Sequence, residues 1–105
     1  MTLRFEDPYW SADDWTTQRQ DILRKELQSE LHPDHQLFNQ SWQIIASRVD
    51  NDDVILRLDC GKIAVVHLTW TSAPESGGFP NTRLFDNATK FWEKEMHKEI
   101  LNYKS

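Results

Sequence analysis

The sequence predicts an α+β fold in which a three-stranded antiparallel meander lies between an N-terminal and a C-terminal helix, in the order α-β-β-β-α. Helical periodicity at the two ends of the chain, and three runs of β-branched and aromatic residues between them, indicate this order. The chain has 105 residues, of which 38% are hydrophobic and 28% charged. This length suits one hydrophobic core, so we expect a single domain over residues 1–105.

The first helix is predicted over residues 11–31. Its apolar positions, among them Leu23 and Leu27, return to one side of a 3.6-residue period, while charged residues fill the other side. Ser11 suits the N-cap position, and Pro33 follows the end of the pattern. The segment is therefore expected to form an amphipathic helix that covers the sheet.

The three strands are predicted over residues 42–49, 54–58 and 63–71. Short polar segments that suit turns separate them. Because such short connections join antiparallel neighbours, we expect a consecutive meander.

The turn of the second hairpin predicts its register. Gly61 suits the left-handed position of a type I turn with a bulge, which would pair Leu58 with Lys62. Counting back along both strands then places Asp53 near His67. One face of the sheet becomes apolar, the opposite face is mixed, and we expect both helices to pack on the apolar face. That face comprises Val54, Leu56, Leu58, Ala64, Val66, Leu68 and Trp70. A two-residue turn at the same place would exchange the faces and is the alternative.

A loop rich in Pro and Gly follows Trp70, and we expect no regular structure there before the last helix. That helix is predicted to begin after an N-cap at Asp86 or Asn87. Its expected apolar stripe comprises Ala88, Trp92, Met96, Ile100 and Tyr103, with Phe91 beside it.

Charge and motifs exclude several classes of function. Seventeen acidic and twelve basic residues give a net charge of −5, which argues against non-specific binding to nucleic acid or anionic membranes. A single cysteine, Cys60, allows no internal disulfide, and the N-terminus lacks the pattern of a signal peptide, so we expect a cytoplasmic protein. The sequence has no glycine-rich phosphate loop, and we expect no cofactor.

The histidines support only an alternative hypothesis. Asp53 beside His67 is the arrangement that orients a general base, and His32 with His35 could contribute to a metal site. Either pair would suit a small hydrolase or a metal-dependent enzyme. A strand histidine with a cross-strand acid is more often structural, and so is a histidine near the end of a helix. We therefore expect neither a catalytic nor a metal site.

Acidic and aromatic residues are the predicted binding residues. Residues 1–35 contain eight acids and four bases, and the first hairpin turn adds further aspartates. Of the five tryptophans, most are expected to fill the core, whereas one or two would anchor a partner at the surface. We predict that a protein with a basic surface binds to Tyr9, Trp10, Asp13, Asp14, Asp50, Asp52 and Asp53.

Two segments resemble a group of small uncharacterised bacterial proteins. The likeness covers residues 48–70 and 79–85 and includes the strings D-x-D-D-V and A-V-V-H-L-T-W. It implies a bacterial origin and no particular activity. As a small acidic domain without catalytic motifs, the chain is also similar in format to immunity proteins, which neutralise the toxins of competing bacteria. That similarity implies an inhibitor that binds a toxin domain, for example a nuclease.

Overall fold

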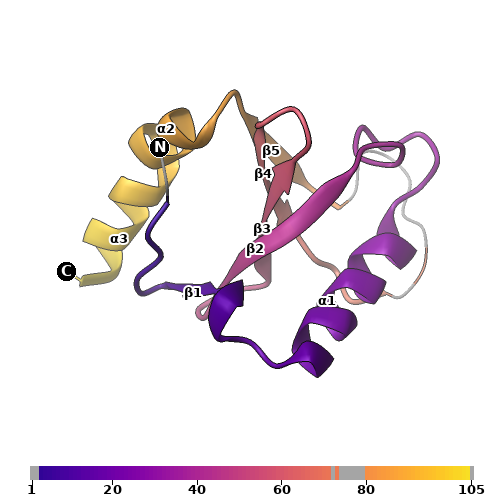
Figure 1. Ribbon diagram of the computed structural model, residues 1–105, viewed down its shortest axis with the longest axis horizontal. Helices are drawn as coiled ribbons and strands as arrows, with labels where there is room; N and C mark the ends of the chain where they lie inside the picture. The colour runs from indigo at the N-terminus through magenta and orange to yellow at the C-terminus, as the bar shows by residue number, and fades with distance from the viewer. Residues whose placement is uncertain (1–2, 72, 74–79, 105) are drawn as a thin grey trace.

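The computed structural model describes residues 3–71, 73 and 80–104, which form an α+β structure in three layers. A five-stranded antiparallel sheet separates α1 (Thr17–Glu30) from the C-terminal helices (Figure 1). The strands follow the order of the chain across the sheet: β1 (Tyr9–Ser11), β2 (Trp42–Arg48), β3 (Asp53–Leu58), β4 (Ile63–His67) and β5 (Thr82–Phe85). None of the described helices is long and apolar enough to cross a membrane.

The prediction of a three-stranded meander is wrong, because a short strand is added at each edge. At one edge, β1 pairs with β2 and places Trp10 opposite Ser47. At the other edge, β5 pairs with β4 and places Leu84 opposite Ala64. The sequence placed the first of these segments before a helix and the second in a loop. Both strands have four residues or fewer, and pairing with a preformed neighbour stabilises them more than any local pattern does.

The predicted register of the β3–β4 hairpin is confirmed. Gly61 has a φ of 91°, which is the left-handed conformation that the bulged turn requires. The N–H of Leu58 donates to the carbonyl oxygen of Lys62 at 2.9 Å. Asp53 lies opposite His67, as expected. The predicted loop after Trp70 falls largely outside the described residues.

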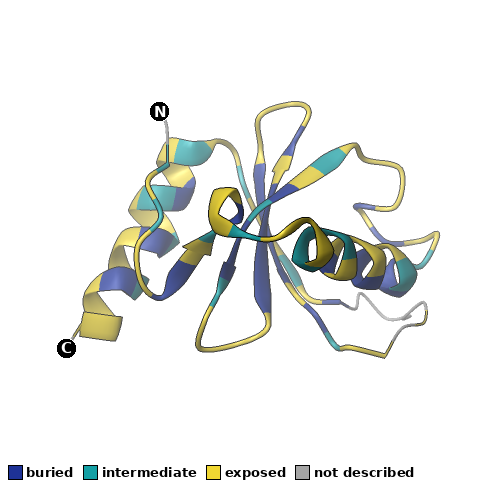
Figure 2. Ribbon diagram, turned by 60° about the horizontal axis from the view of Figure 1, so that its bottom comes forward, coloured by how far each residue is buried: buried dark blue, intermediate teal, exposed yellow. Residues whose placement is uncertain are grey.

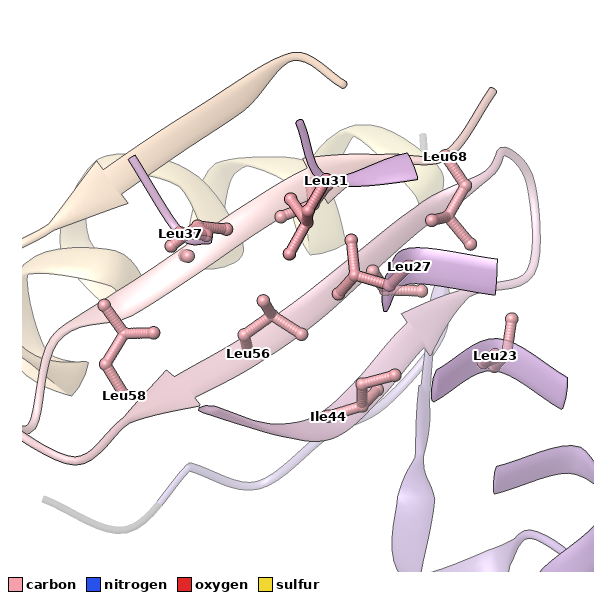
Figure 3. Close-up of a cluster of buried hydrophobic side chains, with 11 residues drawn as sticks. Leu23, Leu27, Leu31, Leu37, Ile44, Leu56, Leu58 and Leu68 are labelled. Atoms are coloured by element: carbon pink, nitrogen blue, oxygen red, sulfur yellow. The ribbon is translucent and has the colours of Figure 1, made fainter. Parts of the chain in front are cut away.

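Both faces of the sheet are buried, so the prediction that both helices pack on one face is wrong. On one face, leucines of α1 meet the apolar residues of β2, β3 and β4 (Figure 3). On the other face, which was expected to be mixed, Ile55 and Val65 are 0% exposed beneath the C-terminal helices (Figure 2). The second core consists of Tyr9, Ala46, Ile55, Ile63, Val65, Phe91, Met96 and Ile100.

The first helix begins later than predicted. Ser11 does act as an N-cap, but of the short 3-10 helix η1 (Ala12–Asp14). The α-helix α1 begins at Thr17, and the hydroxyl of its N-cap, Thr16, accepts a hydrogen bond from the N–H of Arg19 at 3.2 Å. Ser11 and Thr16 therefore cap two successive helical segments, and α1 is the second of them.

The C-terminal helix begins as predicted but is divided into three parts. The side chain of Asn87 caps α2 (Ala88–Phe91) by accepting a hydrogen bond from the N–H of Lys90 at 2.9 Å. A π-helical turn, η2 (Trp92–Met96), and α3 (His97–Lys104) follow. Met96 and Ile100 of the predicted stripe are buried, whereas Tyr103 near its C-terminal end is exposed.

Packing on the second face predicts a large effect of truncating Ile55. We expect Ile55→Ala to lower the free energy of unfolding by about 2–5 kcal/mol, because it leaves a cavity in a fully buried site. Arg57→Ala, on the same face of β3 but exposed, should change it by about 0.5 kcal/mol or less. Urea denaturation measures both values. Equal small losses would contradict the second core.

Candidate functional site

A groove of about 550 Å³ lies between the N-terminal half of α1 and the end of the sheet where β2 turns into β3. Leu23 of α1, Val54 of β3 and Leu68 after β4 belong to both its lining and the first core. Because these side chains are already packed, the groove has a fixed apolar floor.

Exposed apolar side chains gather around this groove. The described part of the chain has eight large hydrophobic residues that are exposed, and four of them line the groove. They come from four different segments and are Trp10 (38% exposed), Ile22 (50%), Val49 (52%) and Trp70 (46%). Scattered exposed apolar residues are ordinary, but a concentration at one concave site is typical of a binding surface.

Arg19 forms the polar part of the groove wall beside Trp10. Its guanidinium carbon lies 4.5 Å from the ring centroid of Trp10 and 4.9 Å from that of Trp15. Its Nη2 donates to the Oγ of Ser47 at 3.0 Å. Burial lowers the pKa of Arg19 from its usual range. The two tryptophans and Ser47 therefore hold a partly desolvated cation at the groove.

The carboxylate of Glu30, which is 0% exposed, positions Trp70 on the opposite side of the site. Backbone N–H groups of Thr69 and Trp70 each donate to it at 2.9 Å, and the hydroxyl of Thr69 donates at 3.0 Å. Trp70 itself has a φ of 60°, a left-handed conformation that bulky residues rarely adopt. The hydrogen bonds to Glu30 therefore stabilise the backbone turn that directs the Trp70 ring toward solvent.

A second carboxyl group shares this buried position. Glu26, one turn earlier on α1, is 8% exposed and hydrogen-bonded to Glu30. Burial raises the pKa of the Glu30 carboxyl above its usual range, the bond to Glu26 raises it further, and the three donated hydrogen bonds lower it in part. The net effect favours the protonated form of Glu30 relative to an exposed glutamate.

The structure brings together only some of the predicted binding residues. Trp10 and Asp52 line the groove, and the Asp52 side chain is exposed with no partner among the described residues. Asp13 and Asp14 lie at a different hollow, which Arg57 also lines. The sequence did not resolve this separation because it depends on the short helix η1.

Three other predicted binding residues, Tyr9, Asp50 and Asp53, make contacts within the fold. Tyr9 is 2% exposed and belongs to the second core. Arg48 donates two hydrogen bonds to Asp50, at 2.8 and 2.7 Å, and they lower the pKa of that carboxyl. A third hydrogen bond, of 2.8 Å, joins Arg48 to Glu99 of α3. Asp53 is 6% exposed. Its position in the turn suggested a solvated side chain, but its two oxygens are engaged within the sheet.

The predicted Asp53–His67 pair is present, and it extends into an ion-pair chain. Nδ1 of His67 lies 2.8 Å from Oδ1 of Asp53, and Nη2 of Arg83 donates to Oδ2 at 3.3 Å. Arg83 also donates to Glu95 of η2 at 2.7 Å. These ion pairs connect β3, β4 and β5 to the C-terminal helices. The contacts of His67 are therefore those of a structural network rather than of a free general base.

His32 and His35 do not form a joint site. Nδ1 of His35 accepts from the N–H of Leu37 at 3.0 Å, and its Nε2 lies 3.0 Å from the carbonyl oxygen of Pro80. Nδ1 of His32 accepts from the N–H of Asp34 at 3.1 Å. Within the described residues, no three His, Cys, Asp or Glu side chains are grouped closely enough to hold a metal ion.

Comparison with protein-family models, with curated proteins and with solved structures finds no match to this chain. The resemblance to small bacterial proteins therefore stays a prediction.

Sequence reasoning missed Arg19, Ile22, Glu30 and Trp70 as parts of a site. Trp70 was placed on the core face by strand alternation, but the strand ends at His67 and the left-handed turn at Trp70 follows. Ile22 was one of several apolar residues in the helical pattern, although it is half exposed. Ile22 lies at the edge of the apolar side of α1, where the helix borders the groove. The sequence pattern alone does not distinguish such an edge position from a buried one.

The raised pKa of Glu30 predicts a pH-dependent stability. Because the folded-state pKa exceeds the ordinary value, the folded protein binds more protons than the unfolded chain, and the free energy of unfolding falls as the pH rises from the ordinary glutamate range through the folded pKa. Glu30→Gln does not ionise. We expect the stability of the parent relative to this variant to decline as the pH rises above the ordinary glutamate range.

Urea denaturation at several pH values measures this difference. Glu93→Gln, at an exposed position of η2, controls for the loss of one carboxylate. Parallel pH profiles of stability for the parent and Glu30→Gln would show that the pKa of Glu30 does not differ between the folded and unfolded protein.

Proposed function

We propose that this protein is a small acidic inhibitor of the immunity type, which acts in the cytoplasm by binding a cognate bacterial toxin domain, for example a nuclease. The observation that carries the proposal is the gathering of Trp10, Ile22, Val49 and Trp70 around one groove. Tryptophan side chains at the centre of an interface often supply much of its binding energy, and the apolar side chains around them help to exclude water. A groove with a packed floor favours a partner that presents a protruding apolar side chain.

Charge supports a partner with a basic surface. The chain has a net charge of −5, and Asp52 adds an exposed carboxylate at the groove. Opposite charges on two proteins accelerate their encounter over distances of about one Debye length, roughly 10 Å at 0.1 M salt. Asp50 and Asp53 are engaged by arginines, so Asp52 is the aspartate of this turn that is placed to meet a partner.

Inhibition by binding accounts for the site better than catalysis does. The polar residues of the Asp53–His67 network are bound to one another. Of these residues only Asp53 lines the groove, and both of its carboxylate oxygens are engaged by His67 and Arg83. The groove combines apolar surface with two arginines, Arg19 and the ion-paired Arg48, and no histidine, cysteine or lysine lines it within the described residues. We therefore propose a binding protein and no enzymatic activity.

Co-expression tests the proposal. The protein is produced together with each product of its neighbouring genes, in a host whose growth that product alone arrests. We expect growth to be restored by one of them and a stoichiometric complex to be recovered. If no neighbouring product is toxic, or if toxicity persists with the protein present, the proposal is wrong.

Two matched variants locate the interface. Ile22→Asp places a charge in the groove, and Leu101→Asp places one at a similarly exposed aliphatic residue on α3. We expect the first to weaken the complex by about tenfold or more and to impair protection, because it opposes burial of an apolar anchor. The second should bind as the parent does. Calorimetry on the purified complex measures both, and the reverse order would place the interface on the C-terminal helices.

A further inference from the structure

Arg19 differs from the other arginines that contact the core in how its charge is compensated. Arg48, whose side chain is 8% exposed, is paired with Asp50 and Glu99. Arg83 is paired with Asp53 and Glu95. Arg19 has no carboxylate partner within the described residues, and its other contacts are the Ser47 hydroxyl and two indole rings.

Asp52 and Asp53 line the same groove as Arg19, but within the described residues neither forms an ion pair with it, and Asp53 is bound to His67 and Arg83. The first turn of α1, to which Arg19 belongs, has no acidic residue, and burial is the cause that lowers its pKa. Its Nε is buried and has no acceptor among the described residues. A cation in such a position loses hydration without the attraction of a counter-ion, and the aromatic rings replace only part of that loss.

Arg19 is also accessible from the groove. The residue is half-buried, and it lines the same cavity as Ile22, Val49 and Trp70. Nη2 makes one hydrogen bond to Ser47, so the guanidinium retains further N–H groups for a ligand. The rings of Trp10 and Trp15 both lie against the guanidinium and restrict its position, and a planar guanidinium is suited to bind both oxygens of a carboxylate.

We propose that Arg19 is the anion-binding residue of the groove and that the groove accepts a carboxylate adjacent to a large apolar side chain. The carboxylate is an Asp or Glu side chain or the C-terminus of the protein partner. The identity of the ligand as part of a protein rests on the proposed function, whereas the anion site does not. A partner with a basic surface can still present one carboxylate to Arg19. The net charge of the protein attracts such a partner during approach, whereas Arg19 binds the carboxylate after water has been excluded from the groove.

Small probes test the site without any toxin. ¹⁵N-labelled protein is titrated with N-acetyl-L-phenylalanine, with its amide, and with N-acetyl-L-aspartyl-L-phenylalaninamide, and the Arg19 Nε–H and Trp10 indole signals are followed by NMR. We expect at least one of the two carboxylate probes to bind about tenfold more tightly than the uncharged amide. The tighter of the two identifies a terminal or a side-chain carboxylate. Added salt should weaken the carboxylate probes and leave the amide unchanged.

Variants assign the effect to Arg19. Arg19→Gln should bind the carboxylate probes and the amide equally, and Arg19→Lys, which keeps the charge but not the planar fork, should fall between this variant and the parent. Arg24→Gln, on the same helix but paired with Asp21, should bind as the parent does. The dispersion of the amide spectrum confirms that each variant is folded.

Three results would overturn the anion site: equal binding of all probes by the parent, no binding by any probe, or a preference for carboxylate that survives in Arg19→Gln. Because the titration contains no toxin, its failure is distinct from failure of the inhibitor proposal. Neutralisation in the co-expression assay without a carboxylate preference would leave the groove as an apolar docking site. A carboxylate preference without neutralisation would leave an anion site with a different role.

Discussion

The β3–β4 hairpin is buried on both faces, and the rest of the structure depends on this constraint. Nine of its eleven strand residues are buried in the described structure, which a sheet covered on one side does not allow. One layer of helix must therefore lie on each side, and the chain supplies α1 before the sheet and α2–α3 after it. The edge strands β1 and β5 extend the sheet beneath these helices and connect it to them. The three layers thus follow from strands in which successive residues are all apolar. Alternation of apolar and polar residues, which indicates a sheet covered on one face, does not describe such strands.

The groove is a consequence of the same arrangement. The α1 helix crosses one face of the sheet, and beyond its N-terminal half the apolar side chains of β1, of the β2–β3 turn and of the segment after β4 are left without a covering element. Polar contacts maintain this opening rather than close it. Glu30 holds the backbone at Trp70, Ser47 and two tryptophans hold Arg19, and Arg48 holds the turn through Asp50. Exposed apolar surface that is rigidly supported is costly to keep, which is why we assign it a binding role.

The sequence predicted those features that depend on local chemistry. The bulged turn at Gly61 and the Asp53–His67 register follow from turn geometry, and Asn87 follows from capping preferences. The missed features depend on tertiary context. A bulge between Ile44 and Ala46 directs these two residues to opposite cores, and the π turn η2 divides the C-terminal helix. Neither has a compositional signal. The site was predicted only in part because its walls come from segments that meet in the folded chain alone.

If the groove is the binding surface, a partner covers it and leaves the C-terminal helices free. Hydrogen–deuterium exchange of the protein alone and in its complex, followed peptide by peptide, tests this most directly. We expect slower exchange in the complex for the segments that contain Trp10, Ile22 and Trp70, with α3 unchanged. Slower exchange confined to α2 and α3, with the groove segments unaffected, would contradict it.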